Sequence, residues 1–311
     1  MIKIDGSAIK GLEVFMAVIE ANGVSNAQSL LNKDASAISR SLSALEARLG
    51  LTLCERGRQG FRLTPEGQQV ADEALKLFAA FRSFENRTES LGGRGSGRLA
   101  IGVIDNIIGE SRFCLDRAIT ELSQYFDDRF HIDLYVKNPY ELEKYLLDKR
   151  VDIALGIFER YHDGLEYRAL YEELDYLYAA PGSPAATLQA EGASSQQLQE
   201  ALKHQNFAAR NFLNESDIGS LGYDLLGDIS YTANLEAIAF LVLSGRYVGF
   251  MPAQYAAPFV SEGRLTPILP NQIKRVSTMA LAYRRGEDKD RPIIATALTV
   301  LNAATHAKMN K

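Results

Sequence analysis

Residues 23–50 read GVSNAQSLLNKDASAISRSLSALEARLG, and this stretch decides the fold of the first part of the chain. Its second half has apolar residues at helical spacing, which places them on one face: Ile38, Leu42, Leu45 and Leu49. Asp34 is a good N-cap for this helix. Gly50 suits its C-terminal end, because glycine adopts the left-handed conformation at low cost. We therefore predict a helix between these two residues.

Two further helices precede this one. The first is predicted by apolar residues at helical spacing and ends at Asn22-Gly23: Ile9, Leu12, Met16 and Ile19. Ser25-Asn26-Ala27-Gln28 has the form of a capping box, which predicts a second, short helix capped by Ser25 and ending near Leu31. A three-residue turn then joins the short helix to the one after Asp34. This is the arrangement of a helix-turn-helix.

The polar side of the third helix is suited to DNA. It carries small hydroxyls and one cation, which can approach a DNA backbone and donate to phosphates or base edges: Ser36, Ser39, Arg40 and Ser43. A short hairpin around Gly57 and Gly60 follows and carries three cations: Arg56, Arg58 and Arg62. Such a basic wing adds phosphate contacts beside a recognition helix. For the helices alone, an ordinary three-helix bundle with a solvated polar face is the alternative interpretation.

The charge of the chain is unevenly distributed. The 311 residues include 34 Lys+Arg and 39 Asp+Glu, giving a net charge of −5, which on average argues against a nucleic-acid partner. Residues 33–62, however, hold six cations against three anions, so that the basic surface is local. We expect DNA affinity to be modest and strongly salt-dependent. The length indicates two or three domains.

A long helix is predicted after the hairpin. Thr64-Pro65-Glu66 has an N-cap residue, a proline at the first helical position and an acid that complements the helix dipole. Residues then recur at spacings of four and three along one side of the helix: Val70, Ala74, Leu77, Phe81, Phe84, Thr88 and Leu91. A seam of about three heptads favours a partner helix, and hence a homodimer that reads a palindromic site. Packing of the seam on its own domain is the alternative.

The remainder of the chain has an α/β pattern. Residues 92–97 contain four glycines and predict a flexible link. Strands expected at 98–104, 130–136 and 151–157 alternate with helices at 113–126 and 140–148, which indicates βαβ units and a parallel sheet. Ligands bind such sheets beyond the carboxyl ends of the strands. That rule selects five candidate effector-binding residues: Asp105, Asn106, Asn138, Tyr140 and Phe158. For each asparagine, a role in a turn is the alternative.

Several classes of protein are excluded by composition. The two cysteines and four histidines have no metal-ligand spacing, and we expect two buried reduced thiols and no metal. No nucleophile elbow, Walker loop or GxGxxG occurs, so no catalytic residue and no cofactor is predicted. The N-terminal ten residues lack the apolar core of a signal peptide, and the longest apolar stretch is far too short to span a membrane. We expect a cytoplasmic protein without a membrane partner.

The N-terminal residues resemble those of the LysR-type transcriptional regulators of bacteria. The resemblance rests on residues 27–31, on Ser36-Ala37-Ile38-Ser39-Arg40-Ser41-Leu42, on Glu55-Arg56 and on Leu63-Thr64-Pro65-Glu66-Gly67. It implies a winged helix-turn-helix over 1–64, a dimerising linker helix over 65–91, a hinge at 92–97 and an effector-binding domain over 98–305. That domain would have two lobes like those of periplasmic binding proteins, residues 98–177 with 267–305 and residues 178–266.

The resemblance adds three effector-binding candidates and implies a set of partners. The added residues are Asn211, Thr232 and Asn234, near the helix-then-strand signature at 241–252. The implied partners are double-stranded promoter DNA, a small-molecule effector and further copies of the chain in a homodimer or homotetramer, with RNA polymerase as a further candidate. Asp105 is unusual at its position and disfavours a simple carboxylate ligand, which favours a zwitterionic or polar effector.

Two residues depart from the family pattern. Ala35 stands where the family commonly has a glutamine at the DNA interface, and it can make only apolar contacts. The base preference of the family therefore cannot be transferred to this chain. Cys54 replaces a phenylalanine as a smaller core residue. The leading hypothesis is a ligand-responsive transcriptional regulator. The alternatives are a small-molecule-binding protein or enzyme with an accessory helical head, and an adaptor that pairs through its long helix.

Overall fold

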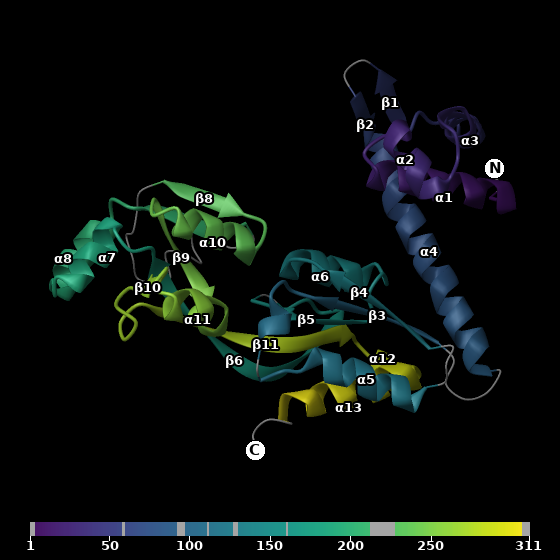
Figure 1. The fold of residues 1–311 in the computed structure, drawn as a ribbon. Helices are drawn as coiled ribbons and strands as arrows, with labels where there is room; N and C mark the ends of the chain where they lie inside the picture. Colours follow the sequence, from purple (N-terminus) through teal and green to yellow (C-terminus); the bar gives the residue numbers. More distant parts are fainter. Residues whose placement is uncertain are drawn as a thin grey trace. The chain divides into compact units, whose positions relative to one another are not determined.

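The computed structural model describes residues 4–57, 60–91, 97–110, 112–126, 130–159, 161–211 and 228–306. The chain divides into two compact units, residues 1–87 and 88–311 (Figure 1). In the described part of the chain, no helix is long and apolar enough to cross a membrane. Cys54 is buried as expected, whereas Cys114 is only half-buried.

The N-terminal unit is a winged helix-turn-helix continued by a long helix. Its elements are α1 (Gly6–Glu20), α2 (Val24–Leu31), α3 (Ala35–Leu49), β1 (Cys54–Gly57), β2 (Gly60–Leu63) and α4 (Pro65–Leu91). The predicted apolar faces meet in one core, in which Phe15, Ile38 and Leu42 are fully buried. The two strands pair antiparallel, with Gly57 opposite Gly60. The predicted fold class is confirmed for this unit.

The helix ends show which local signals decided the fold. Asp34 caps α3 through its carboxylate, which accepts the N–H of Ala37 at 2.6 Å, and Gly50 ends α3 at φ 69°. The predicted start of α2 is wrong, since Gly23 is its N-cap and Ser25 lies inside the helix. Gly23 adopts φ 138°, which favours glycine, and this tight turn lets α2 begin directly after α1.

Gly67 provides the close contact between α4 and the chain before β1. A Cβ at this position would lie 1.9 Å from the carbonyl oxygen of Leu53, which is backbone and cannot turn aside. We expect Gly67→Ala to lower the free energy of unfolding of the N-terminal unit by about 3 kcal/mol, the upper part of the range for overpacking. Chemical unfolding followed by circular dichroism measures the loss.

Gly6→Ala is the matched control for this prediction, because a Cβ on Gly6 has no heavy atom within 4 Å. The control should unfold close to the wild type. Equal stability of the two variants would show that α4 can shift away from Leu53 without cost.

The predicted seam of α4 divides into two parts. Ala74 is buried, and Val70 and Leu77 pack against the core of the N-terminal unit, so this half serves its own domain. Phe81 and Phe84 are exposed, with Phe84 at 67%. Among the side chains of α4 that the structure describes, the large apolar ones that are exposed therefore lie in its second half.

The second unit is built on a nine-stranded sheet with the order β4-β3-β5-β11-β6-β9-β7-β8, with β10 paired to β6. One parallel group is β3 (Arg98–Val103), β4 (His131–Val136) and β5 (Ile153–Ile157), and the other is β7 (Asn206–Arg210), β8 (Ile229–Thr232) and β9 (Tyr247–Pro252). Two long antiparallel strands, β6 (Leu165–Ala179) and β11 (Lys274–Arg284), join the groups; β10 is Thr266–Pro267. This is the predicted two-lobed α/β architecture.

Helices cover both lobes. In the first lobe, α6 (Pro139–Leu147) lies on one side of the sheet and α5 (Leu115–Tyr125) and α13 (Pro292–His306) on the other, beside α12 (Glu287–Asp290) (Figure 1). A 3-10 turn, η1 (Ile107–Gly109), follows β3. The helices of the second lobe are α7 (Pro184–Ala190), α8 (Ser195–Leu202), α10 (Leu235–Leu243) and α11 (Ala253–Ser261).

The chain crosses between the lobes within β6 and β11. Ile268 and Ile273 pack in the core of the second lobe, so the return crossing lies later than the predicted position 267. The register of the two strands shifts between Met279 and Ala280, which leaves Leu170 of β6 as an extra, bulged residue. Apart from this bulge, the two strands form one continuous ribbon.

A buried ionic network holds the first lobe together. Asp152, just before β5, accepts hydrogen bonds from Arg291 at 2.5 Å and Arg284 at 3.2 Å through one oxygen, and from the N–H of Ala100 at 2.9 Å through the other. Arg284 also donates to Glu287 and to two backbone carbonyls. The side chains of Asp152 and both arginines are only 10% exposed. One carboxylate thus joins three strands and the start of α13.

Candidate functional site

The exposed face of α3 carries the predicted DNA-binding side chains. Ser36, Arg40 and Ser43 are exposed and Ser39 is half-buried, on the side away from the buried Ile38. The hydroxyl of Ser36 donates to Asp34 at 2.6 Å and accepts from Arg40 at 3.1 Å. The hydrogen bond from Ser36, followed by the one from the backbone of Ala37, lowers the pKa of Asp34. The start of α3 therefore holds the Arg40 cation in place before any DNA arrives.

The hairpin is tied to α3 by Glu46. Its carboxylate accepts the N–H groups of Leu53 at 2.8 Å and Cys54 at 3.4 Å, at the entry to β1. Arg62 lies exposed on β2 and Arg56 lies on β1 opposite Phe61. Arg58 lies outside the described residues. The start of β1 thus has a fixed position relative to α3.

In the second unit, Asp105 links the two lobes. It follows β3 of the first lobe, and its carboxylate accepts from Arg210 at the end of β7 at 2.7 Å. Its other oxygen accepts the N–H of Leu235, the first residue of α10, at 2.6 Å. Arginine and a helix N-terminus are the donors that proteins use to bind anions. An internal carboxylate therefore occupies an anion site of the second lobe.

A small cavity lies between the lobes beside this contact. Its volume is about 10 Å³, room for about one water molecule. The lining includes the predicted Asp105 and Asn106 and residues that sequence reasoning missed, among them Glu110, Glu173, Arg210, Leu235 and Met279. Helix starts and strand ends are recognisable in the sequence, but the pairing of Arg210 with Asp105 spans 105 positions.

The other predicted effector residues have different surroundings. Asn138 and Asn234 accept backbone N–H groups as the N-caps of α6 and α10. Tyr140 is exposed on α6, and Asn211 is exposed after β7, where its N–H donates to Thr232. Phe158 packs in the core of the first lobe, and the buried hydroxyl of Thr232 donates to Ala209. Of the eight candidates, Asp105 and Asn106 are the two that line the cavity between the lobes; the roles of all eight remain predictions.

Two of the lining carboxylates, Glu110 and Glu173, share a hydrogen-bond donor. The amide nitrogen of Gln254 donates to both Glu110 at 3.0 Å and Glu173 at 2.9 Å, and Arg112 binds Glu110 at 2.6 Å. Burial, followed by the charge of Asp175, raises the pKa of Glu173 to about 7. In the described part of the chain, no group of three His, Cys, Asp or Glu residues is placed to hold a metal ion.

The raised pKa of Glu173 makes a stability prediction. The folded protein holds a proton on this carboxyl more tightly than the unfolded chain, whose value is near 4.5, so stability falls as the pH rises between about 4.5 and 7. Because glutamine does not ionise, Glu173→Gln should exceed the wild type in free energy of unfolding at about pH 8, by up to about 3 kcal/mol. The gain should vanish near pH 4. Denaturant unfolding across this range measures it, and a gain independent of pH would contradict the assignment.

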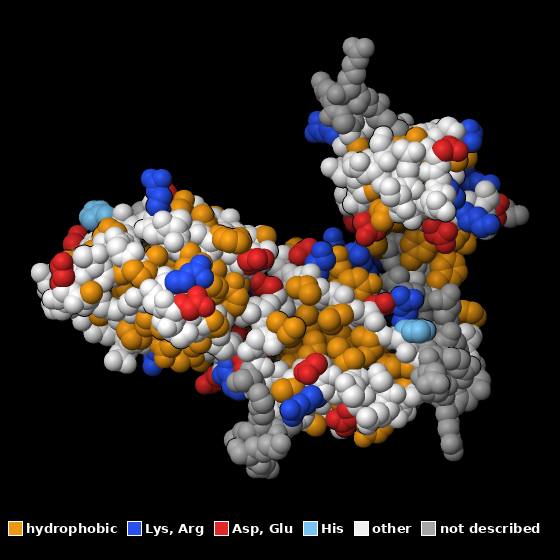
Figure 2. Space-filling view, viewed as in Figure 1, with side chains coloured by type: hydrophobic (Ala, Val, Ile, Leu, Met, Phe, Trp, Pro, Cys, Tyr) orange, Lys and Arg blue, Asp and Glu red, His pale blue; other side chains and the backbone are white. Residues whose placement is uncertain are grey.

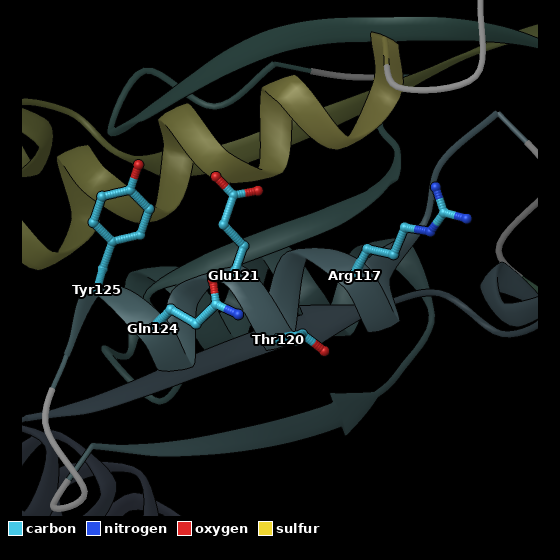
Figure 3. Close-up of a pocket in the computed structure, with 5 residues that line it drawn as sticks. All are labelled: Arg117, Thr120, Glu121, Gln124 and Tyr125. Atoms are coloured by element: carbon cyan, nitrogen blue, oxygen red, sulfur yellow. The ribbon is translucent and has the colours of Figure 1, made fainter. Parts of the chain in front are cut away.

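Two larger hollows lie on the surface of the first lobe. One, of about 740 Å³, is lined mainly by apolar residues of η1, α5 and β4, including Ile108, Leu134 and Val136; its polar lining is Asn106, Glu110, Asp116 and Arg117. Figure 2 shows hydrophobic side chains gathered on this unit over the region where Figure 1 draws β5 and α5. The other, of about 470 Å³, is lined by five side chains of α5 alone: Arg117, Thr120, Glu121, Gln124 and Tyr125 (Figure 3). With all its labelled lining on one helix, this second hollow is a surface depression.

Comparison with known proteins identifies the class to which these features belong. A family model described as the bacterial regulatory helix-turn-helix protein of the lysR family matches residues 9–68, and the LysR substrate binding domain matches residues 92–302. The chain therefore belongs to the LysR family of bacterial transcriptional regulators. It is a ligand-responsive transcriptional regulator that binds promoter DNA and a small-molecule effector and forms oligomers, and it is not an enzyme.

Individual relatives agree with this membership. The HTH-type transcriptional activator BauR of Pseudomonas aeruginosa is 31% identical over 278 residues, which is 89% of both chains. The HTH-type transcriptional regulator CrgA of Neisseria meningitidis serogroup B is 27% identical over 268 residues, covering 84% of this chain and 85% of that one. Full-length CbnR in complex with its target DNA superposes with a TM-score of 0.62 at 21% identity, covering 95% and 99% of the two chains. The likeness to CbnR concerns the fold alone.

Proposed function

We propose that α3 and the β1–β2 wing read a pseudo-palindromic promoter site. The observation that carries the proposal is the exposed row of Ser36, Arg40 and Ser43 on α3, opposite the buried core face. Small hydroxyls permit close approach, and arginine can bind guanine or phosphate. Ser39 would contact DNA at the edge of this row, and Arg56, Arg58 and Arg62 would bind phosphates from the wing.

Two kinds of contact between copies of the chain follow from the exposed apolar surfaces. The exposed half of α4, with Phe81 and Phe84, would pair two chains into a homodimer. The apolar groove formed by Ile108, Leu134 and Val136 would serve a second contact, which would make a homotetramer. The protein would act in the cytoplasm, where its promoter DNA lies, and would pass its response to RNA polymerase.

The effector would bind between the lobes, at Asp105 and Asn106, with Thr232, Asn234 and Asn211 on the side of the second lobe. Asn138, Tyr140 and Phe158 complete the predicted set at the strand ends. The contact of Asp105 with Arg210 and α10 supports a zwitterionic or polar effector, because a simple acid would meet the charge of Asp105. Effector binding would favour one of two lobe arrangements and so alter the DNA complex.

Fluorescence anisotropy with DNA from the region upstream of this chain's own gene tests the DNA-binding proposal. We expect specific binding by at least two chains per site, with stoichiometry checked by light scattering, and a steep loss of affinity as salt rises. Binding that is equal on unrelated DNA, or a complex with a single chain, would contradict it. A screen that finds only simple organic acids to raise the melting temperature would count against a zwitterionic effector.

A further inference from the structure

One face of the β6–β11 ribbon is directed at the cavity between the lobes. In the register of these strands, Tyr171 lies opposite Met279, Glu173 opposite Ser277, and Asp175 opposite Arg275. Directly opposed residues of an antiparallel pair share a face of the sheet. Glu173 and Met279 line the cavity together with Asp105 of the first lobe and Arg210 of the second. Tyr171, Asp175 and Ser277 lie on the same face of the ribbon as these two lining residues.

This face has an excess of buried polar atoms without hydrogen bonds. Among the described residues, seven buried side-chain nitrogen or oxygen atoms have no partner, and three of them lie here: the Tyr171 hydroxyl, one oxygen of Asp175 and the Ser277 hydroxyl. Asp175 and Ser277 are each only 6% exposed. Buried polar atoms in folded proteins are normally hydrogen-bonded, since burial without a partner costs free energy. The concentration of such atoms on one face indicates a polar ligand.

The charges of the face indicate what kind of ligand would suit it. Four carboxylates converge on it and on the cavity: Asp105, Glu110, Glu173 and Asp175. Two of these four are paired with arginines, Asp105 with Arg210 and Glu110 with Arg112, whereas Arg275 pairs with Glu159. Glu173 accepts from the neutral amide of Gln254, and Asp175 keeps a bare oxygen. One water molecule, for which the cavity has room, would hydrate these groups without balancing their charge.

We propose that, when the lobes separate beyond the one-water cavity described above, the interlobe face of β6 and β11 binds the ammonium group of a small amine-bearing effector, held by Glu173 and Asp175 and completed by Tyr171 and Ser277. This inference rests on the proposed effector cleft and names the chemical class that the cleft takes. An ammonium group has three N–H donors and one positive charge, and the face offers carboxylate and hydroxyl acceptors within a buried site. A bound ammonium group would therefore give a partner both to the two carboxylates and to the oxygen atoms that have no hydrogen bond.

The contact of Asp105 with the second lobe, beside the same cavity, limits the rest of the ligand. Arg210 and the N-terminus of α10 already hold the carboxylate of Asp105, so a carboxylate on the ligand has to compete with it. An acid without an amine therefore gains nothing at Glu173 and meets competition at Arg210. Amino acids and amines should bind, and simple acids should not.

Calorimetric titration of the full-length wild type tests the proposal with matched probes. The probes are the straight-chain ω-amino acids from glycine to 6-aminohexanoate, together with the alkylamines and the alkyl carboxylates of the same lengths. We expect at least one amine-bearing probe to bind, more tightly at about pH 8 than at about pH 6, because Glu173, whose pKa burial raises to about 7, must be ionised to hold an ammonium group. The carboxylates should show no heat of binding.

Three variants separate recognition from folding. Glu173→Gln and Asp175→Asn should each weaken the amine-bearing probe at least about tenfold, although Glu173→Gln should be more stable than the wild type at the same pH. Glu172→Gln is the matched control: it removes one carboxylate from the neighbouring, exposed position of β6 and should leave the affinity unchanged. A loss of binding in a stabilised protein cannot be ascribed to misfolding.

The outcomes distinguish this inference from the function on which it rests. Binding by carboxylates alone, binding by none of the probes, or equal affinity in Glu173→Gln and wild type would each overturn the ammonium site, even if the protein binds its promoter. If the protein did not bind its promoter, but did bind an amine and lost that binding in Glu173→Gln and Asp175→Asn, the ammonium site would be supported. The proposed DNA recognition would then be contradicted.

Discussion

Replacement of Arg40 by alanine is expected to cause the largest loss of DNA binding. Arg40 is the cation in the exposed row of serines on α3, and Ser36 already orients it. Removal of an arginine that binds DNA costs about 1–3 kcal/mol per copy. A dimer has two copies, so affinity for the promoter site should fall by at least about 30-fold. Anisotropy titrations of wild type and variant over a range of salt concentrations measure this.

A second substitution separates the two roles that Arg40 could have. If Arg40 binds phosphate, Arg40→Lys should recover most of the affinity. Arg40→Ala should then reduce the slope of log affinity against log salt concentration by about one for each phosphate contact that is lost. If Arg40 reads a base through two hydrogen bonds, lysine should recover little. Arg246→Ala, which removes an exposed cation from the effector-binding unit, is the control for net charge. An unchanged affinity in Arg40→Ala would remove α3 from the recognition surface.

Asp152→Ala is expected to cause the largest loss of stability in the effector-binding unit. Its removal leaves Arg291 without its 2.5 Å partner and deprives Arg284 of one acceptor, while both guanidinium groups stay buried. It also frees the N–H of Ala100 in β3, next to the edge strand of the sheet. Breaking a buried ion pair in this way costs about 3–5 kcal/mol. Denaturant unfolding followed by circular dichroism, with the transitions of the two units fitted separately, measures the loss.

Glu262→Ala provides the comparison for Asp152. Glu262 pairs with Arg264 at 3.2 Å, but both side chains are more than half exposed, so its loss should change stability by less than about 1 kcal/mol. A similar loss in the two variants would mean that the Asp152 network contributes no more than a surface pair. Asp152→Asn should lie between them, since it keeps an acceptor for Ala100.

The N-terminal fold could be predicted because its signals are local. Asp34, Gly50 and Thr64 act within a few residues of their positions, and each has the expected capping role. The predicted start of α2 was wrong because two capping signals compete there, and the tight turn at Gly23 begins the helix before the side chain of Ser25 could cap it. The seam of α4 predicted the apolar side of the helix but not what covers it, since periodicity does not show whether Ala74 faces its own domain or a partner.

The cleft was less predictable because its contacts are non-local. The strand-end rule found Asp105, but Arg210 and Leu235 reach it from elements more than a hundred residues later. The same rule selected Asn138, and the resemblance added Asn234, whereas both side chains cap helices. Glu173 and Asp175 lie in the middle of a long strand, where no sequence signal separates them from the exposed Glu172. Which residues of β11 share a face with Glu173 and Asp175 depends on the register of β6 against β11.

The continuous β6–β11 ribbon also determines how the lobes can move. A glycine-rich loop between lobes would allow motion at little energetic cost, whereas both crossings here are strands joined by a ladder of hydrogen bonds. Bending such a ribbon costs free energy that increases with the bend, and the bulge at Leu170 is where the ladder is weakest. The lobes therefore have an elastic connection. The binding free energy of an effector must offset the cost of the bent state. When the effector dissociates, the ribbon returns the lobes to their unbent arrangement.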